Sequence, residues 1–350
     1  MAEDDLTHRD DDGISLRKSD HLDIVLAPGQ SDGGVTTGLE TIVFAHDALP
    51  EIGMDEIDLS TDFLGRRLRA PILISSMTGG PERSGRINQR LAEAAQTLGI
   101  ALAVGSQRIA LEGRGDAGLT PALRRLAPSV PILANIGGAQ LVRGYGLTEA
   151  RRVMAMIEAD ALIVHLNPLQ EAVQAGGDRD WRGVLDAIAA LVRDLGAPIV
   201  VKEVGAGLSG VVVRRLSDIG VAAIDVAGAG GTSWAAVEAA RASDARTRRI
   251  AETFAGWGIP TAQAIREARD ASREATIIGS GGLRTGLDMA KAIRLGADIV
   301  GQAGASLKAA DESTEAVVDH FADRIEELRI ACFCTGSADL SALRSARLLD

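Results

Sequence analysis

Short, nearly all-apolar runs recur along the chain, and amphipathic helical patterns such as 87–99 and 181–196 lie between them. A short apolar run bounded by turn residues is typical of a β-strand buried on both faces. The runs lie at 71–77, 100–105, 131–137, 161–166, 198–205, 222–228, 275–281 and 299–303. The first four begin about 30 residues apart, the length of one βα unit with its loop. This alternation predicts parallel strands joined by crossover helices.

Eight βα units in about 230 residues fit one closed barrel. We therefore predict an α/β fold, a (β/α)8 TIM barrel with an N-terminal extension; an open doubly wound sheet is the alternative. We expect residues 1–14, which are highly charged, to form a mobile acidic N-terminus. Residues 15–350 would form a single barrel domain that includes the segment 15–70. The long interval 229–274 predicts an elaborated sixth unit.

Most of the predicted strands end in polar residues or glycine. In a barrel of parallel strands these ends converge on one face, where active sites lie. An unpaired polar group costs about 1–3 kcal/mol to bury, so several converging sets indicate a pocket. The residues are Ser75, Ser76, Met77 and Thr78, then Gly105, Ser106, Gln107 and Arg108, then Asn135, then His165, Leu166 and Asn167, then Lys202 and Glu203, and Gly228.

The sequence GSGGLRTG, residues 279–286, lies between an apolar strand and a helical pattern. Glycines let the backbone approach an anion closely, and free N–H groups at a helix start donate to it. Such cradles usually follow strands 7 and 8 of a (β/α)8 barrel. The segment therefore predicts a bound phosphate, carried by a cofactor or by a substrate.

Composition narrows the class of protein. The 350 residues carry a net charge of −11, which argues against a nucleic-acid partner. No apolar stretch reaches the ~18 residues that a membrane span needs, and the acidic N-terminus lacks the pattern of a secretory signal. The two cysteines, Cys332 and Cys334, have no metal-site spacing and would point apart on a helix. We expect a cytoplasmic protein without a membrane partner.

Two features lie in the fifth strand and its loop. Lys202 and Glu203 are neighbours in VVKEVG, and adjacent strand residues face opposite ways, so both cannot point into the barrel. A lysine at the barrel end would balance an anionic ring or a phosphate; an ion pair with a carboxylate is the structural alternative. The loop 205–210, GAGLSG, matches the dinucleotide fingerprint. We interpret it as a βα turn, because it follows the fifth of eight strands.

The loop HLNPLQE gathers polar side chains after the fourth strand. His165 is either a core histidine bonded to the backbone or part of a site with Asn167 and Gln170. Glu171 is a candidate ligand for Mg²⁺ held chiefly by phosphates and water.

A basic cluster near the N-terminus has two interpretations. Arg17, Lys18 and His21 form either a solvated surface or a segment that folds over the barrel mouth. In the second case they would offer cations to a diphosphate.

Together these motifs resemble the type 2 isopentenyl-diphosphate Δ-isomerases, a family of FMN-dependent (β/α)8 enzymes. The resemblance runs from Arg17 to the pair Ala303–Gly304 and covers most of the chain. Each motif alone is weak, but their order is highly specific. The motifs are RKSDHL, SSMTGG, VGSQR, ANIG, HLNPLQE, VKEVG, GAGGTSW, WGIPTA and GSGGLRTGLD.

The resemblance implies a role for each matching position. Residues 15–70 would contribute a substrate-binding segment. Substrate would contact Arg17, Lys18, Ser106, Arg108, His165, Asn167 and Gln170. FMN would contact Ser76, Met77, Thr78, Ser106, Asn135, Lys202 and Thr232, and its phosphate would lie among Gly281, Gly282, Leu283, Arg284, Ala303 and Gly304. Glu171 would hold Mg²⁺, and Lys202, His165 and Gln170 would be catalytic. Ala227 departs from the family, which usually has serine there.

The implied reaction converts isopentenyl diphosphate to dimethylallyl diphosphate, for isoprenoid precursor biosynthesis. A proton is added at C4 and another is removed from C2, and the allylic C–H is too weakly acidic for an ordinary carboxylate base. Reduced FMN would act as acid and base through N5 with no net redox change, and NADPH would reduce it. Lys202 would stabilise the anionic ring. The family also implies a homo-oligomer, a tetramer or an octamer.

Two rival functions share parts of this pattern. An FMN-dependent 2-hydroxyacid oxidase would have the same phosphate cradle, but none of the five histidines (8, 21, 46, 165 and 320) stands in the H-G-x-R context that we expect of such an oxidase. A non-catalytic flavin- or phosphate-binding domain is the other alternative. It would need fewer polar strand ends than this chain has.

Overall fold

The computed structural model describes residues 20–27, 29, 31–76, 81–113, 115–116 and 118–349. Eight parallel strands close into a barrel in the order β10-β3-β4-β5-β6-β7-β8-β9. They are β3 (Ile72–Ile74), β4 (Ala101–Ala103), β5 (Ile132–Gly137), β6 (Ala161–His165), β7 (Ile199–Lys202), β8 (Ala223–Asp225), β9 (Thr276–Ser280) and β10 (Ile299–Gln302). Each strand falls within one of the eight apolar runs, so the predicted (β/α)8 barrel is confirmed.

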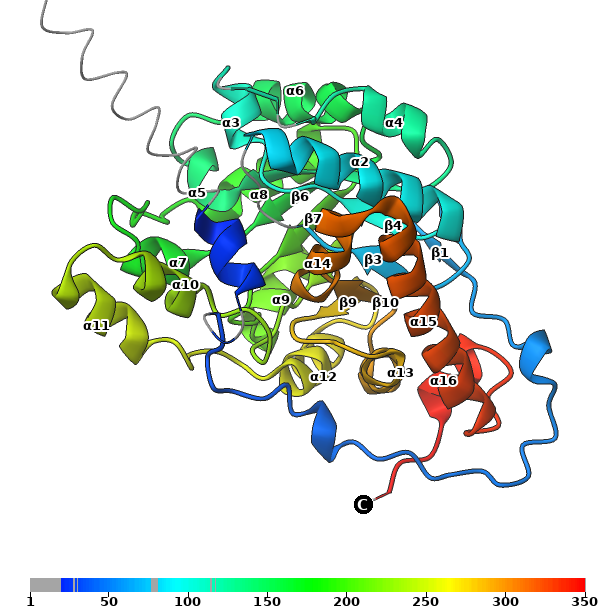
Figure 1. Cartoon of the computed structure of the whole chain (residues 1–350). Helices are drawn as coiled ribbons and strands as arrows, with labels where there is room; N and C mark the ends of the chain where they lie inside the picture. The colour runs from blue at the N-terminus through cyan, green and yellow to red at the C-terminus, as the bar shows by residue number, and fades with distance from the viewer. Residues whose placement is uncertain are drawn as a thin grey trace, which may run out of the picture.

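Helices cover the outside of the barrel (Figure 1). They are α2 (Pro81–Leu98), α3 (Arg108–Leu111), α4 (Ala122–Leu126), α5 (Gly138–Leu141), α6 (Leu147–Ile157), α7 (Pro168–Val173), α8 (Val184–Asp194), α9 (Gly210–Asp218), α10 (Trp234–Arg241), α11 (Ala245–Thr253), α12 (Thr261–Ala271), α13 (Gly286–Leu295), α14 (Gly304–Glu312), α15 (Thr314–Phe333) and α16 (Leu340–Ser345). Residues 20–26 are also helical. Two 3-10 helices, η1 (Leu39–Thr41) and η2 (Met54–Glu56), lie on the segment that leads to the barrel.

Inward-facing side chains fill the barrel in layers. One buried cluster contains Leu73, Ala103, Leu133, Ile163, Val200, Ala223 and Ile278. Two residues further along the same strands stand Ser75, Gly105, Asn135, His165, Lys202, Asp225 and Ser280. Because side chains alternate along a strand, these residues face the same way as the apolar layer. The interior therefore changes from apolar to polar at the carboxyl ends of the strands.

A small hairpin contributes to the same interior cluster. Strands β1 (Thr61–Phe63) and β2 (Arg66–Leu68) pair antiparallel, and both Phe63 and Leu68 belong to the buried cluster of the barrel interior. Leu64 and Gly65 join them with φ values of 49° and 77°, as a two-residue hairpin turn requires. The sequence did not predict this hairpin, because leucine is an unusual residue at a left-handed turn position.

The interval 229–274 is elaborated, as predicted. It contains α10, α11 and α12 in place of a single crossover helix. Figure 1 shows α11 projecting from the barrel beside α10 and α7. Among the helices of the described residues, none combines the length and the hydropathy that crossing a bilayer needs.

The hairpin residue Leu68 is fully buried. We expect Leu68→Ala to lower the free energy of unfolding by about 2–5 kcal/mol, because it opens a cavity in a packed interior. Chemical denaturation followed by circular dichroism measures this change. The control Leu49→Ala, at a side chain that is 74% exposed, should change it by less than about 0.5 kcal/mol. Equal effects of the two variants would contradict a packing role for the hairpin.

Candidate active site

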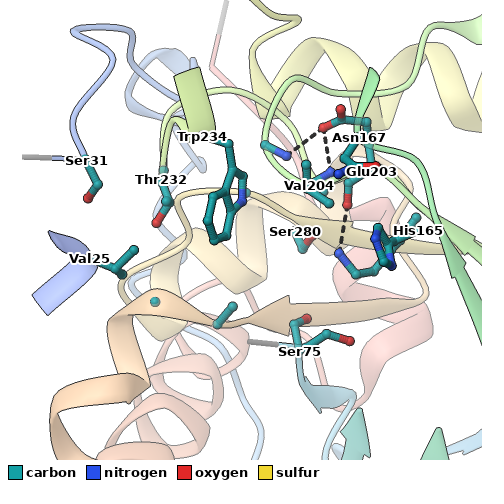
Figure 2. A pocket seen from close by; sticks show the side chains of 18 of the residues that line it. Val25, Ser31, Ser75, His165, Asn167, Glu203, Val204, Thr232, Trp234 and Ser280 are labelled. Carbon is teal, nitrogen blue, oxygen red and sulfur yellow. Dashed lines mark hydrogen bonds between the residues drawn. The ribbon is translucent and has the colours of Figure 1, made fainter. Parts of the chain in front are cut away.

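The carboxyl end of the barrel opens into a cavity of about 690 Å³. This volume is in the usual range of small-molecule and cofactor sites. Figure 2 shows His165 and Asn167 on one side of the cavity, and Thr232 and Trp234 on the other. The cavity therefore lies where the interior of the barrel becomes polar.

Every predicted site residue that the structure describes lines this cavity. These residues are Ser76, Ser106, Arg108, Asn135, His165, Asn167, Gln170, Glu171, Lys202, Thr232, Gly281, Gly282, Leu283, Arg284, Ala303 and Gly304. The predicted residues Arg17, Lys18, Met77 and Thr78 lie outside the described residues. The motifs thus converge in space although they are spread over more than 200 residues of sequence. The role of each residue stays a prediction.

Lys202 and Asp225 form the charged part of the polar layer, and they are direct neighbours across β7 and β8. Nζ of Lys202 donates to the backbone oxygen of Glu203 at 3.0 Å. The hydroxyl of Ser280 donates to Oδ1 of Asp225 at 2.5 Å. Burial lowers the pKa of Lys202 and raises the pKa of Asp225, and the opposite charges counteract both shifts. Within the described part of the chain, no carboxylate forms an ion pair with Lys202 at contact distance.

The carboxylate of Glu203 points toward the loop that follows it, residues 204–207. Its Oε2 accepts hydrogen bonds from the backbone N–H groups of residues 204–207, at distances of 2.6, 2.6, 2.5 and 3.2 Å. An internal carboxylate therefore occupies the amides of the G-x-G-x-x-G segment. The segment leads into α9 as a strand-to-helix turn, as we interpreted it from the sequence.

His165 is oriented by the neighbouring strand. Its Nδ1 lies 2.8 Å from Oδ1 of Asn135, and Nδ2 of Asn135 donates to the backbone oxygen of Val104 at 3.1 Å. Since an amide oxygen only accepts, Nδ1 of His165 is the donor in this bond. His165 thus lines the cavity and is bonded to a side chain, not to the backbone alone.

The start of α7 holds Glu171 in a fixed orientation. Nδ2 of Asn167 donates to Oε1 of Glu171 at 3.0 Å, and the backbone N–H of Asp178 donates to Oε2 at 2.7 Å. Glu171 is only 8% exposed, yet it lines the cavity. These two N–H donors occupy only part of the acceptor capacity of this carboxylate, so its remaining lone pairs can still bind a cation.

A buried carboxylate, Glu238, connects the N-terminal segment to α7. Its Oε1 lies 3.0 Å from both Nε2 of His21 and Nε2 of Gln170, and Arg241 donates to its Oε2 at 2.8 Å. Although burial opposes it, these contacts hold the pKa of Glu238 below its usual value. The ring of His21 also packs edge-on against Trp234, with centroids 5.1 Å apart. His21 is therefore part of the cavity wall and not of a solvated surface.

Arg108 lies at the cavity between two carboxylates. Its Nε donates to Glu112 at 2.8 Å, and its Nη1 lies 3.8 Å from Asp178. Although burial opposes it, these carboxylates raise the pKa of Arg108. The guanidinium is thus held in place while its remaining donors are available to an anion.

Two glycine loops touch at the predicted phosphate cradle. Gly281 and Gly282 have φ values of 104° and 73°. A Cβ on Gly281 would lie 2.1 Å from the backbone oxygen of Gly228, and one on Gly282 would lie 2.3 Å from that of Gly230. Both positions require glycine, for conformation and for space. The loop after β9 therefore lies directly against the loop after β8.

The two helices at this cradle begin differently. In α13, Asp288 accepts from the N–H groups of Arg284 and Thr285 at 3.0 Å, and Glu327 accepts from that of Gly286 at 2.5 Å. By contrast, α14 begins at Gly304 without a side-chain cap, and Ala303, Gly304 and Ala305 line the cavity. The helix start available to an anion is thus that of α14, and not the one that follows GSGGLRTG directly.

The residues present fit FMN. Ser75 and Ser76 each bury a hydroxyl oxygen that has no hydrogen-bond partner among the described residues, and both line the cavity. A polar ligand would satisfy such oxygens. The cavity also offers the Lys202 ammonium for an anionic ring, and the glycine loops with the α14 start for a phosphate.

Several residues at the cavity were not predicted from the sequence. Trp234, Gln302 and His320 line the cavity, and Glu238 lies behind it. The spacing of Trp234 and Glu238 places them one turn apart on α10, which is the only sequence signal that links them. Ala227 also lines the cavity and has a φ of 38°, a left-handed conformation that costs a non-glycine residue about 1 kcal/mol.

Comparison with known proteins places this geometry in a family. A family model described as FMN-dependent dehydrogenase matches residues 157–350. A protein of Stutzerimonas stutzeri (strain A1501) named isopentenyl-diphosphate delta-isomerase is 67% identical over 95% of this chain and 96% of its own length. The proteins of that name from Cronobacter sakazakii and Synechocystis are 60% and 48% identical, over 97% of this chain and 97% of theirs.

Solved structures agree on the fold. A mandelate oxidase superposes with a TM-score of 0.66 over 92% of this chain and 93% of that chain, at 16% identity. A putative lactate oxidase of Pediococcus acidilactici gives 0.66 over 95% and 93%, at 15% identity. At this identity the likeness concerns the barrel alone. On the close full-length relatives, the chain belongs to the isopentenyl-diphosphate delta-isomerase family, built on a barrel of the FMN-dependent dehydrogenase type.

Proposed function

We propose that this chain interconverts isopentenyl diphosphate and dimethylallyl diphosphate, with FMN bound in the barrel cavity. The observation that supports this most directly is that one cavity has two groups of lining residues suited to an anion. Gly281, Gly282 and the start of α14 form one, and Arg108 with the HLNPLQE loop forms the other. A single phosphorylated ligand needs only one such region. Two regions suit a cofactor phosphate and a substrate diphosphate.

Reduced FMN, when bound, would supply the acid and base chemistry through its N5, with no net redox change. Lys202 is the cation available to an anionic reduced ring, since its own partner is a carbonyl and not a carboxylate. The Ser76 hydroxyl and the Asn135 amide would complete the polar contacts of the ring, as the family resemblance implies. Met77, Thr78 and Ser106 belong to the same expected set.

The substrate diphosphate would lie against Arg108, His165 and Asn167. Arg108 is held by Glu112 and Asp178, so little conformational freedom is lost on binding. Gln170 is oriented by Glu238 and would approach the reacting part of the substrate. Arg17 and Lys18 would add cations from the segment that precedes the helical residues 20–26.

Glu171 would contribute one ligand to Mg²⁺. Among the described residues, no group of three or more histidine, cysteine or acidic side chains is placed to hold a metal alone. Mg²⁺ is commonly bound by one or two carboxylates together with phosphates and water. The ion would thus bind with the substrate diphosphate, beside the carboxylate that Asn167 orients.

The proposal also includes a reductant, a compartment and an oligomeric state. NADPH would reduce the flavin, and the enzyme would act in the cytoplasm as a homo-oligomer, a tetramer or an octamer. Exposed Trp257, Ile250 and Leu287 on and beside the outer helices suit contacts between subunits.

We expect the purified protein to be inactive until its flavin is reduced, because the acid and base chemistry requires the reduced ring. Isomerase activity should appear on adding NADPH or dithionite and should be absent with oxidised FMN. Product analysis by mass spectrometry or NMR measures it. Turnover of lactate or mandelate under the same conditions would instead support the oxidase alternative, and full activity with oxidised FMN would exclude the proposed chemistry.

Lys202→Met should lower the isomerisation rate by roughly 100-fold, because it removes the cation that stabilises the reduced ring. Flavin reduction by NADPH should slow as well, which absorbance at the flavin band records. Lys308→Met, at an exposed position of α14, is the matched control and should change neither quantity. An unchanged reduction rate in Lys202→Met would argue against this role.

Glu171→Gln should raise the Mg²⁺ concentration for half-maximal activity by about tenfold, since it removes one charged ligand. Flavin content should not change, because Glu171 lies on the substrate side of the cavity. A Mg²⁺ titration of the activity measures the effect, with the exposed Glu252→Gln as the control. An identical Mg²⁺ dependence in Glu171→Gln and wild type would disprove the assignment.

A further inference from the structure

Gln302 and His320 belong to the cavity wall, but the proposed chemistry uses neither. Gln302 is the last residue of β10 and is only 2% exposed. His320 lies on α15 and is half-buried. The two side chains meet at 2.5 Å, between Nε2 of His320 and Oε1 of Gln302.

Gln302 reaches from this contact to the phosphate cradle. Its Nε2 donates to the backbone oxygen of Leu283 at 2.9 Å. The same peptide unit is also held on its other side, because the N–H of Arg284 donates to Asp288 at 3.0 Å. A peptide bond is planar, so fixing its oxygen and its N–H fixes the orientation of the whole unit. The carbonyl dipole of Leu283 is thereby held by an amide donor and is not free to oppose an anion in the cradle.

The position of Gln302 in the chain links both halves of the cradle. Its side chain holds the loop after β9, while its backbone continues directly into Ala303 and Gly304 at the open start of α14. The pairing of β9 with β10 brings the two segments together, and the Gln302 side chain adds a direct bond between them at the cradle.

The Leu283 carbonyl and His320 together fix which way the Gln302 amide faces. Because Nε2 of Gln302 donates to Leu283, Oε1 must face His320, so Nε2 of the imidazole carries a proton. With the amide reversed, the Gln302 NH2 group would meet the imidazole N–H and its oxygen would meet the Leu283 carbonyl. Burial and Arg324 lower the pKa of His320, which favours the neutral ring.

We propose that Gln302 and His320 are positioning residues for the cofactor phosphate: His320 orients the Gln302 amide, and Gln302 holds the Leu283 peptide so that the cradle accepts an anion. This inference rests on the proposed function, since it takes the phosphate to be that of FMN. It predicts an effect on the phosphate end of the cofactor and none on the ring.

Flavin binding to the apoprotein tests the proposal, with FMN and riboflavin compared by fluorescence titration. Riboflavin has the same ring and no phosphate. Gln302→Leu should raise the Kd for FMN by about tenfold, the value of one hydrogen bond in a buried site, and the Kd for riboflavin by less than about twofold. His320→Leu should raise the Kd for FMN by about threefold, and His320→Gln, which retains an amide donor, should bind FMN nearly as wild type does.

Gln263→Leu is the matched control, because Gln263 is an exposed residue of α12; both its Kd values should stay within about twofold of wild type. If Gln302→Leu weakens FMN and riboflavin equally, or leaves both unchanged, the proposal is overturned. If the wild-type protein binds FMN no more tightly than riboflavin, the phosphate cradle itself, and with it the proposed cofactor site, is wrong. The two failures are therefore distinguishable.

Discussion

The buried charges of Lys202 and Asp225 constrain the open end of the barrel more than any other interaction. Removing an ion from water costs several kcal/mol unless close partners replace the water. Ser280 donates to Asp225, and the Glu203 carbonyl accepts from Lys202. Glu203, the obvious carboxylate partner for the lysine, binds the amides of its own loop. The ammonium of Lys202 is thus balanced at longer range by Asp225, and no carboxylate of the described residues contacts it directly.

The backbone amides at the carboxyl end of the barrel also differ in whether a side chain of the protein already binds them. Each βα loop of a parallel barrel presents N–H groups that attract anions, so the chain has several possible phosphate sites. Glu203 occupies the amides after β7, and Asp288 and Glu327 occupy those at the start of α13. The start of α14 has no side-chain cap. At the two loops that meet in the cradle, the amides left open to a phosphate are therefore those at the start of α14.

The sequence predicted those features that depend on local pattern. Each barrel strand is an apolar run with a polar end, so both the strands and the convergence of their ends could be predicted. The β1–β2 hairpin could not, because its Leu64–Gly65 turn departs from the usual turn residues. Glu238 was also missed, since it stands 68 residues from Gln170 and 217 from His21. Contacts of this range depend on packing between helices, which one sequence does not reveal.

A single arginine connects the helical residues 20–26, part of which line the cavity, to α14, the helix that begins at the cradle. Arg83 on α2 binds Asp23 of the N-terminal helical segment at 2.9 Å and Asp311 of α14 at 2.7 Å. On the other side of the cavity, Glu238 binds His21 of the same segment together with Gln170. These contacts hold the segment against α2 and α14 on one side and against α7 and α10 on the other, and Arg241 of α10 also lies 3.6 Å from Asp20. Because His21, Val25 and Leu26 of this segment line the cavity, these polar contacts hold that part of the cavity wall in place.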